Sequence, residues 1–258
     1  MSEEQKPKGP VKPKLSDVSE QDIINKLLGN LPSVTEVPVE LPSKNKFYSL
    51  PDPTKPITLR AMTFEDEKAM MSNKNVNIDV LNKLLSRCVS NIGVEHLLQM
   101  DKLYLIMKLR ELSYGEDYNA TINCPNCKKD NDVSFKVSQL PVTYLEDDAT
   151  DPVEITLPIL DKKVKVRRPR VADENYFSNA EYALTNLWRF IEEIEGYTQK
   201  TVISKVISQL PLKDAHAVVE ALSASDYGVN TKVRFVCDYC GNNEIMELPI
   251  TADFFTES

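Results

Sequence analysis

Residues 119–135, NATINCPNCKKDNDVSF, and residues 231–248, TKVRFVCDYCGNNEIMEL, carry the same motif twice. In each, a Cys-x-x-Cys turn lies between two runs of strand character. A turn with two intervening residues directs two sulfur atoms at one point about 2.3 Å from each, and two such turns complete a tetrahedron. The predicted ligands of one zinc ion are therefore Cys124, Cys127, Cys237 and Cys240.

Four sulfur ligands leave no coordination position for water or substrate, so a zinc site of this kind is structural rather than catalytic. Two interpretations compete with zinc: redox-active pairs of the thioredoxin type, and relic turns that bind no metal. A redox-active Cys-x-x-Cys normally opens a helix, whereas each pair here opens a hairpin, which favours zinc.

The similarity between the two stretches extends beyond the cysteines. An offset of 113 residues relates both cysteine pairs and several positions upstream of them. Matching positions are Asp101 and Asp214, Leu109 and Leu222, and the Tyr-Gly pairs at 114–115 and 227–228. With a gap of a few residues, PITLRAMTFEDEKAM at 56–70 resembles KVKVRRPRVADENYF at 163–177. We therefore expect an internal duplication.

The expected fold class is α+β, with two repeated units of strand, helices and hairpin related by a pseudo-twofold axis. One unit supplies only two thiols, so the duplication predicts one structural zinc ion per chain, held between the two units. The predicted segments are a disordered arm at 1–15, a short helix and Pro-rich extended segment at 16–54, a first unit at 55–142, an acidic linker at 143–156 and a second unit at 157–258.

The region before the first unit is expected to run over a surface. Ser19 can cap a short amphipathic helix, EQDIINKLLGN, that ends at Gly29. Its apolar stripe can pack on its own unit or on a neighbouring subunit. Five prolines within residues 31–53 then predict an extended segment. In this segment, Phe47 and Tyr48 either anchor the chain to its own core or contact a partner.

Helical spacing is clear in both units. Residues 100–115, MDKLYLIMKLRELSYG, predict a helix capped by Asp101 and ended by Gly115. Residues 179–197, NAEYALTNLWRFIEEIEGY, predict a second long helix, with Trp188 in the core.

A dense basic cluster lies on the strand predicted within residues 160–170, LDKKVKVRRPR. Its members are Lys162, Lys163, Lys165, Arg167, Arg168 and Arg170. We expect either a solvated edge strand protected by lysine or a binding site for an acidic protein, with nucleic acid as a third possibility.

Composition bounds the functional classes. The 258 residues are 41% hydrophobic and carry a formal net charge of −8, which describes a globular chain with no global attraction to nucleic-acid phosphates. No apolar run reaches membrane-spanning length and no export leader is recognisable, so we expect an intracellular protein without membrane contact. Cys88 lies in a helical pattern and is predicted to be a small buried residue.

The sequence contains no recognisable catalytic motif. His96 and His216 have no counterparts in the other unit, and Asp147 and Asp148 lie in a loop without apolar surroundings. A phosphate-binding glycine loop, a nucleophile elbow and a zinc-protease motif are all missing from the sequence. We therefore predict that the protein is not an enzyme and has no small-molecule substrate.

Three stretches together resemble a known family: LPSKNKFYSLP at 41–51, PITLRAMTFEDEKAM, and MDKLYLIMKLRELSYGEDYNATINCPNC at 100–127. They are similar to the baseplate hub and hub-assembly proteins of contractile-tailed, T-even-like bacteriophages. The resemblance covers residues 38–142 well and the second unit more loosely. The family usually has a glycine in the first stretch, where this chain has Asn45.

The resemblance implies a structural or assembly protein of the phage tail, with Cys124 and Cys127 foremost among the matching residues. Its partners are then other tail and baseplate hub proteins, and its location is the virion baseplate, the host cytoplasm during assembly, or both. The alternative is a zinc-ribbon adaptor in transcription or nucleic-acid handling. Such adaptors usually show a basic surface with stacking aromatic residues, and this chain is acidic.

Overall fold

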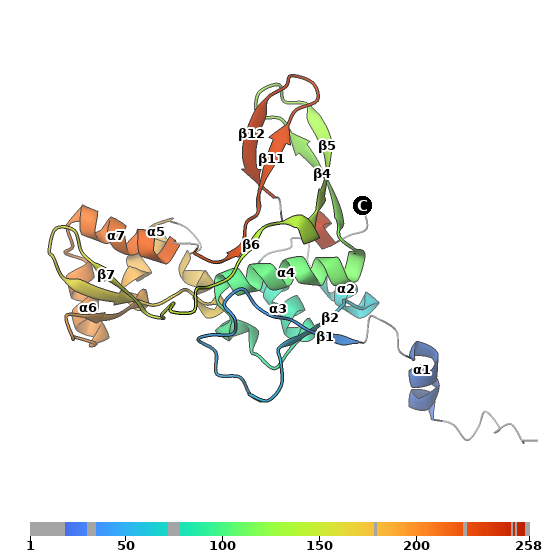
Figure 1. Cartoon of the computed structure of the whole chain (residues 1–258), viewed down its shortest axis with the longest axis horizontal. Coiled ribbons are helices and arrows are strands. Elements are labelled where there is room, and N and C mark those ends of the chain that lie inside the picture. The colour runs from blue at the N-terminus through green and yellow to red at the C-terminus, as the bar shows by residue number, and fades with distance from the viewer. Residues whose placement is uncertain are drawn as a thin grey trace, which may run out of the picture.

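The computed structural model describes residues 19–29, 35–71, 78–177, 180–223, 226–248, 250 and 252–255. It has a mixed α+β fold, as the sequence predicts. Figure 1 shows a central body around helix α4, a lobe formed by the second half of the chain, a projecting arm of two hairpins, and helix α1 standing apart. The N-terminal segment that we expected to be disordered, residues 1–15, lies outside the described residues.

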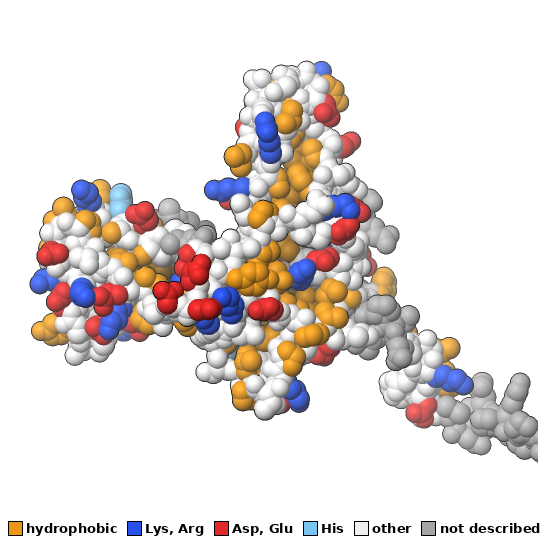
Figure 2. Space-filling view, viewed as in Figure 1, with side chains coloured by type: hydrophobic (Ala, Val, Ile, Leu, Met, Phe, Trp, Pro, Cys, Tyr) orange, Lys and Arg blue, Asp and Glu red, His pale blue; other side chains and the backbone are white. Residues whose placement is uncertain are grey.

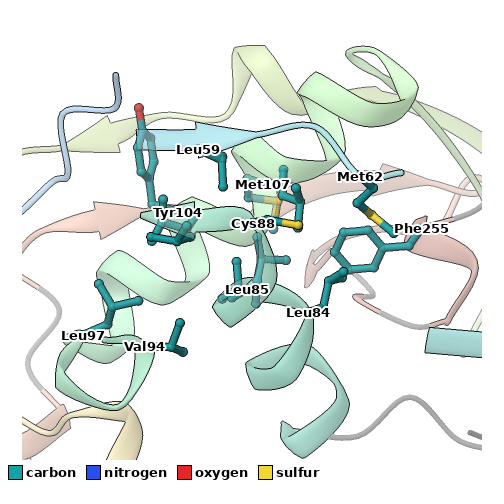
Figure 3. Close-up of a cluster of buried hydrophobic side chains, with 14 of the residues drawn as sticks. Leu59, Met62, Leu84, Leu85, Cys88, Val94, Leu97, Tyr104, Met107 and Phe255 are labelled. Carbon is teal, nitrogen blue, oxygen red and sulfur yellow. The ribbon is translucent and has the colours of Figure 1, made fainter. Parts of the chain in front are cut away.

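The central body contains the larger hydrophobic core. Helix α4 (Gln99–Tyr114) runs through it and packs against α3 (Ile78–Cys88) and a small antiparallel sheet. The sheet has the order β1-β2-β3, and α2 follows its central strand. The bounds are β1 (Glu36–Pro38), β2 (Thr58–Arg60), α2 (Phe64–Met71), β3 (Val89–Ser90) and a 3-10 turn at Val94–His96. Figure 3 shows how α3, α4 and β2 contribute side chains to one cluster that also includes Phe255.

Asp101 and Tyr48 attach the Pro-rich segment to α4. The helix begins at Gln99, and Asp101 does not cap it as we predicted. The carboxylate of Asp101 is instead fully buried and accepts hydrogen bonds from the Ser43 N–H (3.0 Å) and the Tyr48 hydroxyl (2.5 Å). Burial raises the pKa of both Asp101 and Tyr48. Tyr48 therefore anchors the extended segment to its own core.

The lobe has a separate hydrophobic core around a second three-stranded sheet of order β7-β8-β9. Val164 of the central strand, Phe190, Ile203 and Val218 are fully buried in it. The bounds are β7 (Val153–Thr156), β8 (Lys163–Val166), a 3-10 segment at Val171–Phe177, α5 (Ala180–Asn186), a 3-10 turn at Leu187–Phe190, β9 (Ile191–Ile194), α6 (Lys200–Ile207) and α7 (Leu212–Ser223).

The long helix predicted at residues 179–197 is wrong in its second half. Helix α5 ends at Asn186, and β9 pairs antiparallel with β8. The β-branched side chains of Ile191 and Ile194 suit a strand, and both are buried against the lobe core. Trp188 packs against the same core, as predicted.

The basic strand is also not an edge strand, because β8 is central in its sheet. Five of its six cationic side chains pair with carboxylates on neighbouring elements. These pairs are Lys163–Glu154, Lys165–Glu193, Arg167–Asp173, Arg168–Asp226 and Arg170–Asp151, at 2.7, 2.9, 2.7, 2.7 and 3.4 Å. The cluster thus neutralises acids of its own chain.

The arm consists of two hairpins, one from each half of the chain, that project side by side from the body (Figure 1). Beneath them, β6 (Val142–Thr143) pairs with β10 (Gly228–Val229) and joins the two halves. The hairpin strands are β4 (Asp117–Asn123) with β5 (Asp130–Lys136), and β11 (Lys232–Val236) with β12 (Asn243–Glu247). Short 3-10 turns follow at Val137–Gln139 and Ala252–Phe255.

Helix α1 (Glu20–Leu28) begins and ends as predicted. The Ser19 hydroxyl accepts a hydrogen bond from the Asp22 N–H (3.1 Å), and Gly29 terminates the helix with a positive φ of 42°. None of its residues is buried. Of the described helices, none is long and apolar enough to cross a membrane.

Candidate metal centre

The two Cys-x-x-Cys turns have the same backbone geometry. In the first, the Cys124 N–H donates to the Lys129 carbonyl and the Lys128 N–H donates to the Cys124 carbonyl, both at 2.9 Å. In the second, the Cys237 N–H donates to Asn242 (2.8 Å) and the Gly241 N–H donates to Cys237 (3.0 Å). Each turn therefore closes on its first cysteine in the same way.

The residue after each second cysteine has a left-handed conformation. Gly241 adopts φ 68° without steric cost, whereas Lys128 adopts φ 59° at the matching position. The side-chain amide of Asn123 donates to the Lys128 carbonyl (2.9 Å) and so holds this turn. The glycine in the second motif was a signal for this geometry that our sequence analysis did not use.

The four sulfur atoms lie close together where the turn of one hairpin meets the turn of the other. All lie within 4.8 Å of one another. The shortest separations join the hairpins: Cys124 Sγ to Cys240 Sγ is 3.7 Å, and Cys127 Sγ to Cys237 Sγ is 3.6 Å. A tetrahedral ion with bonds of about 2.3 Å to sulfur has sulfur–sulfur edges of about 3.8 Å. The thiol set therefore fits a four-coordinate metal ion.

The cysteines are also part of the small core of the arm. Cys124 and Cys237 are buried, Cys127 is half-buried and Cys240 is exposed. Five hydrophobic side chains belong to the same core: Ile122, Val133, Phe135, Phe235 and Met246. Because two-stranded hairpins are marginal on their own, a core this small needs a further constraint.

The pKa values of two of the thiols are shifted in opposite directions. The Lys129 N–H lowers the pKa of Cys127, but desolvation and the three neighbouring thiols outweigh it and raise the pKa to about 11. Burial raises the pKa of Cys237, yet the N–H groups of Tyr239 and Cys240, with the neighbouring thiols, lower it to about 6. One thiolate thus forms readily, and a bound metal ion stabilises the others as thiolates.

Asn131 links the two turns beneath the sulfur atoms, a role that the sequence did not reveal. It is buried on β5, where its amide donates to the Lys129 carbonyl (3.0 Å) and its oxygen accepts the Asp238 N–H (2.9 Å). The Lys129 ammonium group also lies 4.5 Å from the ring centroid of Tyr239. The Asp238–Asn131 hydrogen bond and the Lys129–Tyr239 contact therefore join the first turn to the second.

The other chemically interesting residues lie away from the cluster. Cys88 is buried in the central core, as predicted, and burial raises the pKa of its thiol to about 11. His96 is exposed beside Glu95. Asp147 forms an ion pair with Lys44 at 2.7 Å. Among the described residues, the four cysteines are the only group of His, Cys, Asp and Glu side chains close enough to hold a metal ion.

Comparison with known proteins identifies a family. No curated protein and no solved structure matched the chain. A family model described as T4 bacteriophage base plate protein matches residues 34–256, which include all four clustered cysteines. This family has a structural place in the phage tail and implies contact with other tail proteins. The chain belongs to the T4 bacteriophage base plate protein family.

Proposed function

We propose that the protein is a structural or assembly component of the phage tail baseplate hub that binds other tail subunits and catalyses no reaction. The observation that carries this proposal is the family match over residues 34–256. The closed set of four thiols supports a non-catalytic role, because four sulfur ligands leave no position for substrate on the metal. Its location is then the virion baseplate, the host cytoplasm during assembly, or both.

The metal in this proposal is one structural zinc ion per chain, held by Cys124, Cys127, Cys237 and Cys240. Thiolate ligands in tetrahedral arrangement suit zinc, and the distances of 3.6 and 3.7 Å between sulfur atoms agree with such a site. A structural zinc ion of this type contributes on the order of 10 kcal/mol to folding. Thiol titration with and without a chelator separates this site from a redox-active pair.

The two units arose, in this proposal, by duplication of one ancestral unit and are related by a pseudo-twofold axis through the metal. Three similarities support it: the matching hydrogen bonds of the two turns, the matching order of the two three-stranded sheets, and the constant spacing of the cysteines. A single unit could complete the thiolate set only by pairing with a second copy.

The nucleic-acid adaptor is the weaker alternative. The basic residues around β8 pair with acids of the same chain, so they offer little free charge to phosphates. On the face in Figure 2, acidic and basic side chains are interspersed over the lobe and form no continuous basic surface. Salt-dependent retention on immobilised DNA would favour the adaptor.

The experiment that tests the tail assignment is quantitative mass spectrometry of purified particles beside the matching infected-cell lysate. A fixed, small copy number relative to known tail subunits identifies a baseplate component. Abundance in the lysate without incorporation into particles identifies an assembly factor, provided that the chain co-purifies with a hub subunit. Absence from particles together with no association with any tail subunit contradicts the proposal.

A further inference from the structure

An apolar surface lies at the end of the lobe, remote from the metal centre. Two adjoining grooves of about 490 and 290 Å³ share Val202 and Val206 of α6. We call this the distal apolar surface, and its residues are Leu160, Ile194, Tyr197, Val202, Val206 and Leu210. Tyr197 is 62% exposed, Val202 45% and Leu160 43%. Exposed apolar side chains grouped in this way mark an interaction site.

A turn at Ile159 and Leu160 borders the distal apolar surface, and the central body has a similar turn at Ser43. In the body, another segment of the chain covers the turn. Both turns follow a Leu-Pro pair and bind a buried aspartate. Asp101 accepts the Ser43 N–H, and Asp214 accepts the N–H groups of Ile159 (2.6 Å) and Leu160 (3.1 Å).

In the body, Leu145 covers the turn. Its N–H donates to the Pro42 carbonyl (2.9 Å), and its buried side chain packs against Phe47 and Tyr48. The acids that follow Leu145 bind lysines of the turn, as in the Lys44–Asp147 pair. In the lobe, Ile159 remains 55% exposed, and no described segment covers it. The covered turn shows which chemistry fits such a place: apolar side chains flanked by acids, opposite lysines.

Helix α1 also carries apolar side chains next to acidic ones. Ile24, Leu27 and Leu28 form its apolar stripe, and Leu27 is 77% exposed. Its first turn carries Glu20 and Asp22. On the distal apolar surface, the ammonium groups of Lys162 and Lys205 form no ion pair with any described residue. The helix and the surface therefore complement each other in hydrophobicity, and the two lysines, beside Glu195 as the single acid among the described lining residues, complement the acidic first turn of the helix.

The two lie far apart within one chain. α1 and α6 lie at opposite ends of the molecule, with α4 between them (Figure 1). Five residues separate Gly29 from Thr35, a tether that spans at most about 20 Å. The 16 residues of α4 alone extend over about 24 Å. In the arrangement that the structure shows, α1 therefore reaches this surface only on a second molecule.

We propose that α1 of one copy docks on the distal apolar surface of a second copy. The contact joins two different surfaces, so it is heterologous, and copies associate head to tail into a ring or an open chain. The acidic first turn of α1 lies near Lys162 and Lys205 in this arrangement, so salt weakens the contact. This association is independent of the zinc site and of the tail assignment.

Two single substitutions in the full-length protein test the proposal by sedimentation velocity. Leu27→Glu places a charge in the apolar stripe of the helix, and Val202→Glu places one in the distal apolar surface. Both side chains are exposed, so neither change disturbs a core. The wild-type chain is expected to associate with rising concentration, whereas each variant alone stays monomeric. A mixture of the two variants is expected to form one complex of two chains and nothing larger, because it retains one intact helix and one intact surface.

A labelled peptide of residues 16–30 gives a second measurement by fluorescence anisotropy. It is expected to bind the Leu27→Glu chain, whose distal apolar surface is intact. Binding to the Val202→Glu chain is expected to be weaker by about tenfold or more, because the contact then lacks one buried valine. Phe64→Glu, 76% exposed on α2, is the matched control and should leave binding unchanged.

Four outcomes overturn the proposal: a monomeric wild-type chain at its highest soluble concentration, a variant mixture that remains monomeric, peptide binding unaffected by Val202→Glu, or peptide binding abolished by Phe64→Glu. The last would place the helix on the surface around Phe64 of α2. Unchanged thermal unfolding of all three variants establishes that each is folded.

Discussion

The central body and the lobe contain sheets of the same strand order that are held with different strength. In each, an arginine at the end of the central strand binds an aspartate six residues further on: Arg60 with Asp66, and Arg167 with Asp173, both at 2.7 Å. Each aspartate also accepts a backbone N–H from the residue three positions before it. The local structure around the two strands is therefore the same.

The surroundings of the two aspartates differ. Asp66 is fully buried and receives a second arginine, Arg87 of α3, at 2.6 Å, whereas Asp173 retains slight exposure. The body also covers its Leu-Pro turn with Leu145, while the turn of the lobe remains open at Ile159. Similar frameworks thus differ in how far their own chain covers them: the body covers its Leu-Pro turn, whereas the lobe leaves its turn exposed.

The largest expected effect comes from the cysteines, because they join the two halves. Cys124→Ser and Cys237→Ser each remove one ligand, one from each hairpin. Both should abolish metal binding and lower the free energy of unfolding by several kcal/mol, out of a metal contribution on the order of 10 kcal/mol. Metal analysis and thermal unfolding measure the two effects.

Hydrogen exchange shows whether the loss of one cysteine affects one half of the molecule or both. In either cysteine variant, amides of both hairpins should lose protection, because each hairpin depends on the other. Cys88→Ala is the control, since it removes a thiol of the central core and should leave the metal content unchanged. Loosening confined to the mutated hairpin would separate the two halves and break the account.

The next effect distinguishes the body from the lobe directly. Asp66→Asn leaves two arginines without their carboxylate and should destabilise the protein by about 3 kcal/mol. Asp173→Asn should cost about half as much, since Arg167 also lies 3.4 Å from Glu192. Urea unfolding measures both, and an equal or reversed order would show that the body is not the more strongly held region.

The pH dependence sharpens this comparison. Burial raises the pKa of Asp66, but Arg60, Thr63 and Arg87 outweigh it and hold the pKa well below its usual range. The pKa of Asp173 is lowered in the same way, with Arg167 the main opposing partner. A lowered pKa in the folded state gives stability that is present above the unfolded value of about 4 and is lost as the pH falls below it.

The expected result is a loss of stability below pH about 4 that is steeper in the wild-type chain than in Asp66→Asn. Asp101 acts in the opposite direction, because burial raises its pKa. Its contribution is present at low pH and is lost as the pH rises through the pKa of the folded state. Urea unfolding between pH 3 and 7 would contradict this assignment if both asparagine variants kept the wild-type slope.

The smallest effect concerns the lobe surface. Lys165 and Glu193 join β8 to β9 at 2.9 Å, and both side chains are partly exposed. Lys165→Met should therefore change the free energy of unfolding by less than about 1 kcal/mol. A loss as large as that of Asp173→Asn, in the same unfolding assay, would mean that the basic strand contributes more to the lobe than its central Arg167–Asp173 pair.

The sequence predicted the clustering of the four cysteines better than it predicted the lobe. The spacing of the cysteines was enough to predict that Cys124, Cys127, Cys237 and Cys240 lie close together, because ligand geometry in a short turn is a local property. Asn131 escaped notice, because its role depends on how the two hairpins pack. Helical spacing located α4, but the role of Asp101 was set by a turn 58 residues earlier in the chain.

The errors in the lobe have a common physical cause. Residues 191–194 combine two isoleucines with two glutamates, a pattern compatible with a helix face or a short strand. The neighbouring strand β8 decides between them, by offering backbone hydrogen bonds and a lysine opposite Glu193. For the same reason, the lysines and arginines of β8 suggested an exposed edge. Their acidic partners lie on other elements, which a single segment does not reveal.

Native mass spectrometry of the full chain, purified without added metal, tests the central claim most directly. The account predicts one zinc ion per chain in every oligomeric state, lost together in the Cys124→Ser and Cys237→Ser variants. It also predicts that the monomer of the Leu27→Glu variant retains its zinc, since all four ligands come from one chain. Zinc found only in dimers, or a monomer with two disulfides and no metal, would contradict it.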